Sequence, residues 1–252
     1  MKTPYTFSFI ISYKHNNERL HNLRRVLDWV NGFNKVEIIL VEQDKCSKIS
    51  HLYLRCKHIF IKSELPFNKS WGYNVGLNHS NTNVIVFGDS DIIMKPDEFI
   101  TGLQSLENFE MISPYSSVVD LNPTENMLPF EHILKIDRFG RGDFDNQKIN
   151  LCGGITMFRK DSILKIGGWD QRFFGWGCED DFQTIKVKTL LTWSELKGKC
   201  FHFHHSKEPI NEKLYKRSFQ ILEESSKLST SDLMMIIDRS RNTMGVKNIY
   251  NK

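Results

Sequence analysis

The chain has 252 residues, and its 34 Lys and Arg against 30 Asp and Glu give a formal net charge of +4. The charged fraction of 25% and the hydrophobic fraction of 40% are those of ordinary globular proteins, which excludes a disordered or fibrous chain. The charge is mild and scattered, so it does not indicate a nucleic-acid partner, and we expect none. The five cysteines are widely spaced with no CxxC pair, which predicts free thiols.

The longest apolar run, Phe7 to Ser12, has the length of a strand and falls far short of the roughly 18 residues of a membrane-spanning helix. The N-terminus lacks the long apolar core and the small-residue cleavage site of a signal peptide. We therefore expect a soluble, cytoplasmic protein, or a chain trimmed of a membrane anchor. The chain contains no alanine and is rich in Lys, Asn and Ile, a bias that an AT-rich bacterial, phage or viral genome would explain.

Strand and helix patterns alternate through the first half of the chain. Predicted strands and helices follow one another at Thr6–Ser12, Asn17–Val30, Val36–Val41, His58–Ile61, Ser70–Asn78 and Asn83–Gly88. This alternation predicts a mostly parallel sheet with helices on its faces. Ligands of such sheets bind at the carboxyl ends of the strands, so chemistry is expected just after Ile11, Val41 and Phe87.

The stretch from Ser113 to Asn150 has weak periodicity and many Pro and Gly residues, which is typical of a functional lid or a partly disordered segment. Asp161 is the expected N-cap of a short helix that ends at Gly167. The remaining predicted elements are strands at Gly153–Phe158 and Cys200–His204 and helices at Asp161–Ile166, Glu179–Leu191, Glu212–Lys227 and Ser231–Arg239. We expect a single domain over residues 1–252.

Two carboxylates, Asp89 and Asp91, flank Ser90 directly after the predicted strand that ends at Gly88. At i and i+2 in extended chain both can point to the same side, where they would form a hard oxygen site for Mg²⁺ or Mn²⁺. A solvated turn with an Asx hydrogen bond is the alternative. Two histidines, His202 and His205, lie at i and i+3 near another predicted strand end and could share a metal with one carboxylate. The alternative for them is a polar strand end.

Glycines flank Trp176, and the three acids Glu179, Asp180 and Asp181 follow at the start of a predicted helix. Gly175 and Gly177 make a hinge possible, because glycine accepts dihedral angles that other residues avoid. Acids are also ordinary at a helix N-terminus, which is the alternative interpretation. Crowding of three acids, however, raises the pKa of one towards the range of a general base.

In this order, the motifs resemble those of the β-1,4-galactosyltransferases, a family of metal-dependent, inverting GT-A glycosyltransferases. The resemblance covers about Phe9 to Lys207, and chondroitin-polymerase-like and polypeptide N-acetylgalactosaminyl transferases share parts of it. The matching segments are Tyr13-Lys14-His15, Phe67-Asn68-Lys69, Asn74-Val75-Gly76, Asp89-Ser90-Asp91, Gly153-Gly154, Gly175-Trp176-Gly177-Cys178-Glu179-Asp180-Asp181 and His205-Ser206. The resemblance implies a GT-A fold, that is, a nucleotide-binding, Rossmann-like, mixed and mostly parallel sheet flanked by helices, with C-terminal helices.

The resemblance also implies a role for each matching residue. The catalytic base would be Asp180, with Glu179 beside it orienting the acceptor, and Mn²⁺ or Mg²⁺ would be held by Asp91, His202 and His205. His202 falls where the family usually has methionine, and Cys178 falls where it has glycine. Residues implied to bind the nucleotide-sugar are Ser12, Tyr13, Lys14, Gln43, Phe67, Lys69, Asp89, Ser90 and Trp176. Residues implied to bind the acceptor are Gly153, Gly154, Trp176, Glu179 and Asp181.

The implied reaction moves a hexose, namely galactose, glucose or an N-acetylhexosamine, from a UDP-sugar to a hydroxyl of a glycan or glycoconjugate. Residues 1–112 would bind the nucleotide-sugar, residues 113–150 would form a flexible lid-like segment, and residues 151–252 would bind the acceptor and carry the catalytic acids. Three alternatives remain: a retaining N-acetylgalactosaminyl-type transferase, an inactive transferase fold that serves as a lectin or scaffold, and a sugar nucleotidylyltransferase. The last is disfavoured because residues 12–17 contain no glycine for a phosphate loop. The sequence indicates no oligomeric state.

Overall fold

The computed structural model describes residues 1–49, 55–144, 146–206 and 209–246. Position 145, within the expected lid-like segment, and Lys207, at the end of the resemblance, lie outside the described residues. The strands are β1 (Phe7–Tyr13), β2 (Val36–Asp44), β3 (Lys57–Lys62), β4 (Val84–Gly88), β5 (Ile92–Met94), β6 (Met111–Ser113), β7 (Ser117–Asp120), β8 (Ile155–Arg159), β9 (Trp193–Glu195) and β10 (Lys199–His202). The helices are α1 (Asn17–Asn31), α2 (Lys69–Asn78), α3 (Pro96–Ser105), the 3-10 turn η1 (Glu125–Met127), α4 (Phe130–Ile133), α5 (Lys160–Lys165), α6 (Glu179–Leu190), α7 (Glu212–Ser226) and α8 (Thr230–Arg241).

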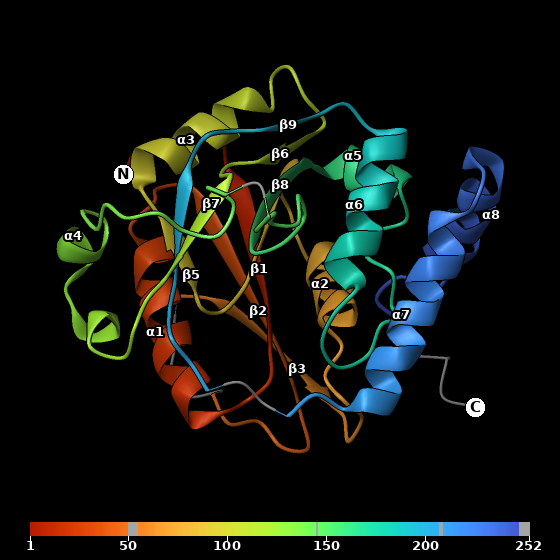
Figure 1. Cartoon of the computed structure of the whole chain (residues 1–252), viewed down its shortest axis with the longest axis horizontal. Coiled ribbons are helices and arrows are strands. Elements are labelled where there is room, and N and C mark those ends of the chain that lie inside the picture. The colour runs from red at the N-terminus through yellow and green to blue at the C-terminus, as the bar shows by residue number, and fades with distance from the viewer. Residues whose placement is uncertain (50–54, 145, 207–208, 247–252) are drawn as a thin grey trace.

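A seven-stranded sheet with strand order β3-β2-β1-β4-β8-β6-β9 forms the centre of the molecule (Figure 1). The first four strands in that order run parallel to one another, β8 runs antiparallel to both of its neighbours, and β9 is parallel to β6. The mixed, mostly parallel sheet predicted from the sequence is therefore confirmed. A second sheet has the order β5-β10-β7, in which β10 is antiparallel to β5 and parallel to β7.

Alternate side chains of β1 enter two different cores. Phe7 and Phe9 pack against α1 and α3, in a cluster that includes Trp29 and Phe99. Ile10 points to the other face, where the buried side of α2 covers it. A strand buried on both faces is mostly apolar along its whole length, which is why the runs within β1 and β2 were visible in the sequence.

The C-terminal helices α7 and α8 form a third, smaller core with the start of α6 (Figure 1). Phe173 and Phe182 pack with their ring centroids 5.8 Å apart and their planes tilted by 41°, and Leu233 and Ile237 of α8 bury their side chains in the same cluster. The expected C-terminal helices are thus confirmed, and they support the segment in which the three consecutive acids lie. Among the described residues, no helix is both long enough and apolar enough to cross a membrane.

Several sequence-based boundaries need correction. The short strands β5, β6, β7 and β9 and helix α3 were not predicted. The segment 113–150 is not irregular throughout, because it contains β7, η1 and α4. The N-cap of α5 is Arg159 rather than Asp161, whose carboxylate instead accepts the backbone N–H of Ser162 at 2.8 Å within the first turn. The predicted strand Cys200–His204 ends at His202.

Candidate functional site

Two sheets bring the predicted residues to one edge of the molecule. Strands β1, β2 and β4 all end at this edge because they run parallel and in close register. Asp89, Ser90 and Asp91 lie in the connection from β4 to β5. The carbonyl of Asp91 accepts the backbone N–H of Phe203 at 2.8 Å, which ties the connection to the end of β10. The aspartates and the two histidines, more than 110 residues apart in sequence, therefore meet.

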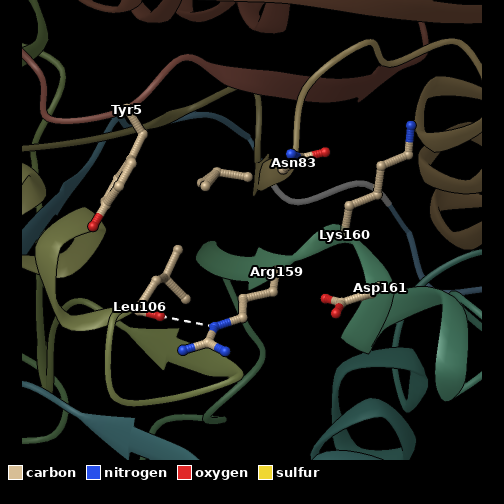
Figure 2. A pocket seen from close by; sticks show the side chains of 7 residues that line it. Tyr5, Asn83, Leu106, Arg159, Lys160 and Asp161 are labelled. Carbon is tan, nitrogen blue, oxygen red and sulfur yellow. Dashed lines mark hydrogen bonds between the residues drawn. The ribbon is translucent and has the colours of Figure 1, made fainter.

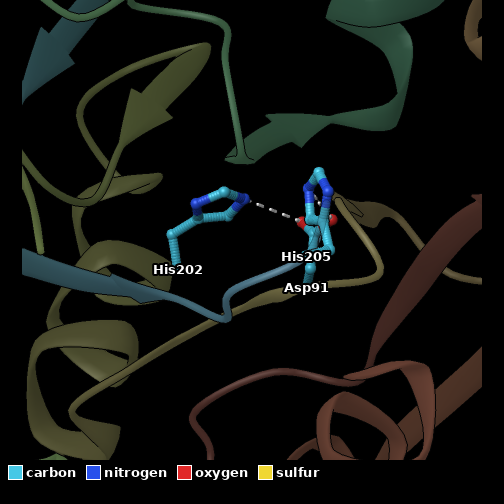
Figure 3. Close-up of side chains that lie close together, drawn as sticks. All are labelled: Asp91, His202 and His205. Atoms are coloured by element: carbon cyan, nitrogen blue, oxygen red, sulfur yellow. Dashed lines mark ion pairs between the residues drawn. The ribbon is translucent and has the colours of Figure 1, made fainter. Parts of the chain in front are cut away.

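Asp91, His202 and His205 form a cluster with the geometry of a metal site (Figure 3). The Nε2 atom of His202 lies 3.7 Å from Oδ1 of Asp91, and Nε2 of His205 lies 3.4 Å from Oδ2. The candidate ligand atoms all lie within 4.8 Å of one another, and no second group of this kind occurs in the described part of the chain. One carboxylate and two imidazoles are a donor set that first-row divalent metals accept.

Each imidazole has a partner behind it. Nδ1 of His205 lies 3.0 Å from the carbonyl oxygen of Ser206, and Nδ1 of His202 lies 2.9 Å from a carboxylate oxygen of Asp120. Both partners are acceptors only, so both Nδ1 atoms carry hydrogen in these contacts. The Nε2 atoms of both rings face Asp91, and in the neutral imidazole each offers a lone pair to a metal there. The residues present therefore fit a divalent ion. The hydrogen bond from His202 contributes most to lowering the pKa of Asp120 to about 2.

Lys69, at the start of α2, lies among three carboxylates beside the metal cluster. Its Nζ is 2.7 Å from Oδ1 of Asp180, 3.0 Å from Oε1 of Glu179 and 3.7 Å from Oδ1 of Asp89. One turn further along α2, the hydroxyl of Tyr73 donates to Asp89 at 2.9 Å. Residues from the start of α2, the end of β4 and the start of α6 are thus linked through one ammonium group.

The carboxylates and the lysine shift one another's pKa. Burial raises the pKa of Asp180 to about 8 against the opposing effect of Lys69, and the charges of Glu179 and Asp89 add to the rise. Burial alone would lower the pKa of Lys69, but the three carboxylates raise it well above its ordinary value. The lysine therefore stays charged, and Asp180 gains and loses its proton near neutral pH. That is the range in which a general base is most effective.

The loop before α6 has an unusual backbone. Gly175 and Gly177 have φ of 76° and 101°, and the N-cap Cys178 is also left-handed at 72° although it carries a side chain. The side chain of Trp176 is 66% exposed, and its ring stacks on Tyr215 of α7 with the planes 23° apart. The predicted glycine hinge therefore coincides with a left-handed stretch that presents an aromatic side chain to solvent.

The predicted glycine pair lies against the acids. A Cβ added to Gly153 would lie 3.5 Å from Oδ2 of Asp180, so this glycine borders the carboxylate oxygen that does not contact Lys69. Gly154 has φ of 65°, and a Cβ there would meet the hydroxyl of Tyr115 at 2.2 Å. That hydroxyl donates to the carbonyl of Gly153 at 2.5 Å. Asp181, the third acid, has a raised pKa, chiefly because of its burial.

Other predicted residues have structural partners. Ser12 and Gln43 are buried, and Nε2 of Gln43 donates to the hydroxyl of Ser12 at 3.1 Å and to the carbonyl of Asn68 at 2.8 Å. These bonds fix the start of α2 to the ends of β1 and β2. Ser90 is also buried. Tyr13 is packed in the core, whereas its neighbour Lys14 is exposed.

Phe67 is half-buried, and its carbonyl accepts the N–H of Gly175 at 2.8 Å, which joins the start of α2 to the glycine hinge. The Asn74-Val75-Gly76 motif is structural, because the amide of Asn74 bonds to the backbone of Trp169 in both directions, at 2.7 and 2.8 Å. Tyr73, Tyr115 and Asp120 also contribute to the site, and sequence reasoning missed all three. Tyr73 alone left a signal, since it lies one helical turn from Lys69.

A hollow of about 480 Å³ opens at the other edge of the central sheet, where β1 and β4 begin (Figure 2). Tyr5, Asn83 and Lys160 line it, and Nε of Arg159 donates to the carbonyl of Leu106 at 2.8 Å in its wall. None of the candidate catalytic or metal-binding residues lines this hollow. The predicted site residues therefore lie at the carboxyl edge and not at this one.

Comparison with known proteins shows which families the chain is similar to. Residues 141–206 match the family model described as the N-terminal domain of galactosyltransferase. The chain is 27% identical over 120 residues to β-1,4-galactosyltransferase 5 of Danio rerio, which covers 46% of this chain and 25% of that protein. It is also 27% identical over 120 residues to β-1,4-galactosyltransferase 1 of Mus musculus, covering 43% of this chain and 29% of that protein. The matched part is thus under a third of the length of these relatives.

Two solved structures share the fold. A Drosophila β-1,4-galactosyltransferase 7 variant in complex with manganese, UDP-Gal and xylobiose aligns with a TM-score of 0.56 at 14% identity, over 90% of this chain and 81% of that one. GalNAc-T7 with UDP, GalNAc and Mn²⁺ aligns with a TM-score of 0.61 at 13% identity, over 98% of this chain and 57% of that one. The chain therefore has the GT-A glycosyltransferase fold. Over the matched part, its sequence is similar to those of β-1,4-galactosyltransferases, the family that its motifs resemble.

Proposed function

We propose that the chain is a metal-dependent, inverting glycosyltransferase that moves a hexose from a UDP-sugar to a hydroxyl of a glycan or glycoconjugate. One observation carries the proposal: the carboxylate with the raised pKa, Asp180, and the cluster of Asp91, His202 and His205 lie at the same edge of the sheet, joined through Lys69 and Asp89. The bound groups of the two structural neighbours, manganese or Mn²⁺ with UDP-Gal or UDP, support the same donor and ion here.

The donor half of the site is built for a departing diphosphate. Asp91, His202 and His205 would hold Mn²⁺ or Mg²⁺, which supplies positive charge where the leaving group becomes more negative. Lys69 stays protonated and adds a second positive charge that needs no reorganisation during the reaction. Asp89, oriented by Tyr73, would accept a hydroxyl of the ribose or of the donor sugar. Most of these groups come from residues 1–112, the proposed nucleotide-sugar half.

The acceptor half of the site is built for proton removal. An acceptor hydroxyl is a weak nucleophile at neutral pH, and Asp180 would take its proton as it attacks the anomeric carbon. Oδ1 of Asp180 is engaged by Lys69, so Oδ2, which faces Gly153, is the oxygen that receives the proton. Glu179 and Asp181 would orient the acceptor, and Trp176 would cover it and exclude water. A single displacement of this kind inverts the anomeric configuration.

The state of the cysteines bears on the compartment in which the protein would act. All five cysteines are free thiols, which fits a reducing compartment such as the cytoplasm.

The segment 113–150 borders one side of the metal cluster through Asp120 and would act as a lid-like element. A retaining transferase is the second candidate, favoured by the TM-score of 0.61 with GalNAc-T7.

A panel of UDP-sugars tests the proposal. The chain is incubated with each donor and Mn²⁺, with and without simple sugar acceptors, and release of UDP is measured. We expect release that depends on one hexose donor and increases when an acceptor is added. NMR of the product then reads the anomeric configuration, which separates an inverting from a retaining enzyme. Binding of UDP-sugars without turnover on any acceptor would instead indicate a binding protein.

A further inference from the structure

We propose that Asp120 is a positioning residue for the metal site, acting through His202, and that it makes the 113–150 segment part of that site. The proposal rests on the metal-binding role proposed above for His202. Asp120 lies at the end of β7, in a segment whose sequence gave no sign of ligand chemistry. Its carboxylate is 2.9 Å from Nδ1 of His202, on the opposite side of the ring from Asp91.

Strand register produces this contact. Strands β7 and β10 are parallel neighbours, and Asp120 is the register partner of His202. The next residue, Leu121, donates its N–H to the carbonyl of His202 at 2.9 Å, which fixes the two strand ends relative to each other. The carboxylate thus reaches the imidazole from a backbone position set by the ladder, and not from a flexible loop.

The carboxylate is also held from its other side. Nε and Nη2 of Arg141 donate to the two oxygens of Asp120 at 2.8 and 3.0 Å, a bidentate pair. The backbone of Arg141 is itself bonded to Val118 of β7 in both directions, at 2.8 Å each. A bidentate guanidinium restricts the rotation of a carboxylate. Asp120 therefore presents a fixed acceptor to His202, although about half of its side chain is exposed.

The chemical consequence concerns the tautomer of His202. A neutral imidazole carries one N–H, and an ionised carboxylate can only accept, so Asp120 selects the form with hydrogen on Nδ1. The lone pair is then on Nε2, which faces Asp91. Carboxylates behind ligating histidines raise the basicity of the ligand, and their loss commonly costs about 10–100-fold in metal affinity. His205 depends on a backbone carbonyl instead, so among the residues that the structure describes a side chain lies behind His202 and none behind His205.

Two variants and a control test the proposal. Asp120→Ala removes the acceptor, and Asp120→Asn keeps the shape but can donate as well as accept, so it no longer selects a tautomer. Asp137→Asn is the control, because Asp137 lies in the same segment, is 98% exposed and contacts Lys199 rather than His202. Melting temperatures confirm that each variant is folded. Mn²⁺ affinity is measured by electron paramagnetic resonance of the free ion, with and without UDP, and nitrogen-15 NMR of the imidazoles reports the tautomer of His202.

We expect Asp120→Ala to weaken Mn²⁺ binding about 10–100-fold and to turn His202 into a mixture of tautomers. Asp120→Asn should also weaken Mn²⁺ binding and mix the tautomers of His202. The Mn²⁺ affinity of Asp137→Asn should stay within about twofold of that of the wild type. Equal Mn²⁺ affinity in the wild type and Asp120→Ala, or an unchanged tautomer, would overturn the role of Asp120 and leave the proposed function intact. A wild-type chain that binds no Mn²⁺ would overturn both.

Discussion

Replacement of Lys69 by methionine should move the pH dependence of the proposed reaction. Lys69 is the one cation that contacts Asp180 and Glu179 among the described residues, and its ammonium also lies 5.9 Å from the ring centroid of Trp169. Methionine keeps a long unbranched side chain that fills the same space but removes the charge. Asp89, Glu179 and Asp180 then lose their shared counter-ion, and Asp180 is the one with the shortest contact.

The size of the effect follows from the distance. An opposite charge within about 4 Å lowers the pKa of a carboxyl group by roughly 1–3 units, and Nζ of Lys69 lies 2.7 Å from Oδ1 of Asp180. The pKa of Asp180 is raised to about 8 even with the lysine present. Without the lysine it rises further. Asp180 accepts a proton only when it is ionised, so activity increases with pH through this pKa. The acid limb of kcat/KM should therefore move to higher pH by about 1–3 pH units.

The assay is kcat/KM for transfer from pH 5.5 to pH 10 at saturating Mn²⁺, for the wild type and Lys69→Met. The matched control is Lys95→Met, since the side chain of Lys95 is 45% exposed and, in the described part of the chain, forms an ion pair only with Glu98, at 3.9 Å. The height of the profile falls in Lys69→Met because a contact to the sugar donor is lost. The shift of the limb between the wild type and Lys69→Met reports the change in the pKa of Asp180, because Lys69 contacts Asp180 and neither histidine. A limb that stays in place or moves to lower pH would refute the assignment of Asp180 as the base.

Three further results are expected. Asp91→Asn should abolish transfer and weaken Mn²⁺-dependent UDP binding in a titration, whereas full activity of the wild type in excess chelator would contradict the metal site. Gly153→Ala should lower kcat, because its Cβ would occupy the space beside Oδ2 of Asp180, and should change the melting temperature little, because the contact is an ordinary one. Gly154→Ala should instead lower the melting temperature, because its φ is 65° and the hydroxyl of Tyr115 fills the space that the Cβ needs. Hydrogen exchange around Trp176, and in part of 113–150, should slow when donor and metal bind, and equal rates in both states would argue against a closing loop.

The fold was largely accessible from the sequence because the strands of the parallel half are buried on both faces. β1, β2 and β4 each contain a short, mostly apolar run, and the first helix, α1, buries Leu23, Val26, Leu27 and Val30 at helical spacing. The strands of three or four residues are too short to show a period, so β5, β6, β7 and β9 were missed. Helix α3 did leave a signal, because Pro96 opens it and Asp97 and Glu98 occupy its first turn.

The candidate site was accessible only where its residues lie close together in sequence. The aspartates after β4 and the acids at the start of α6 form visible motifs, and the structure brings them together through Lys69. Asp120 could not be found in this way, because its contact with His202 depends on the register of two strands separated by about 80 residues. For Ser12 and Gln43, the sequence predicted the position but not the partners. Both lie near the strand ends as expected, but their side chains bond to each other, and that of Gln43 also bonds to the residue before α2.

The measurement that tests the account most directly compares Asp180→Asn and Asp181→Asn with the wild type in two assays, sugar transfer and Mn²⁺-dependent UDP binding. Asparagine is nearly the same size as aspartate but has no basic oxygen. The account predicts that Asp180→Asn loses roughly 10² or more in turnover while it binds UDP almost normally, and that Asp181→Asn loses much less. If the acids serve only the N-terminus of α6, all three proteins will turn over alike and the variants will differ only slightly in melting temperature. Normal turnover by Asp180→Asn would contradict the mechanism.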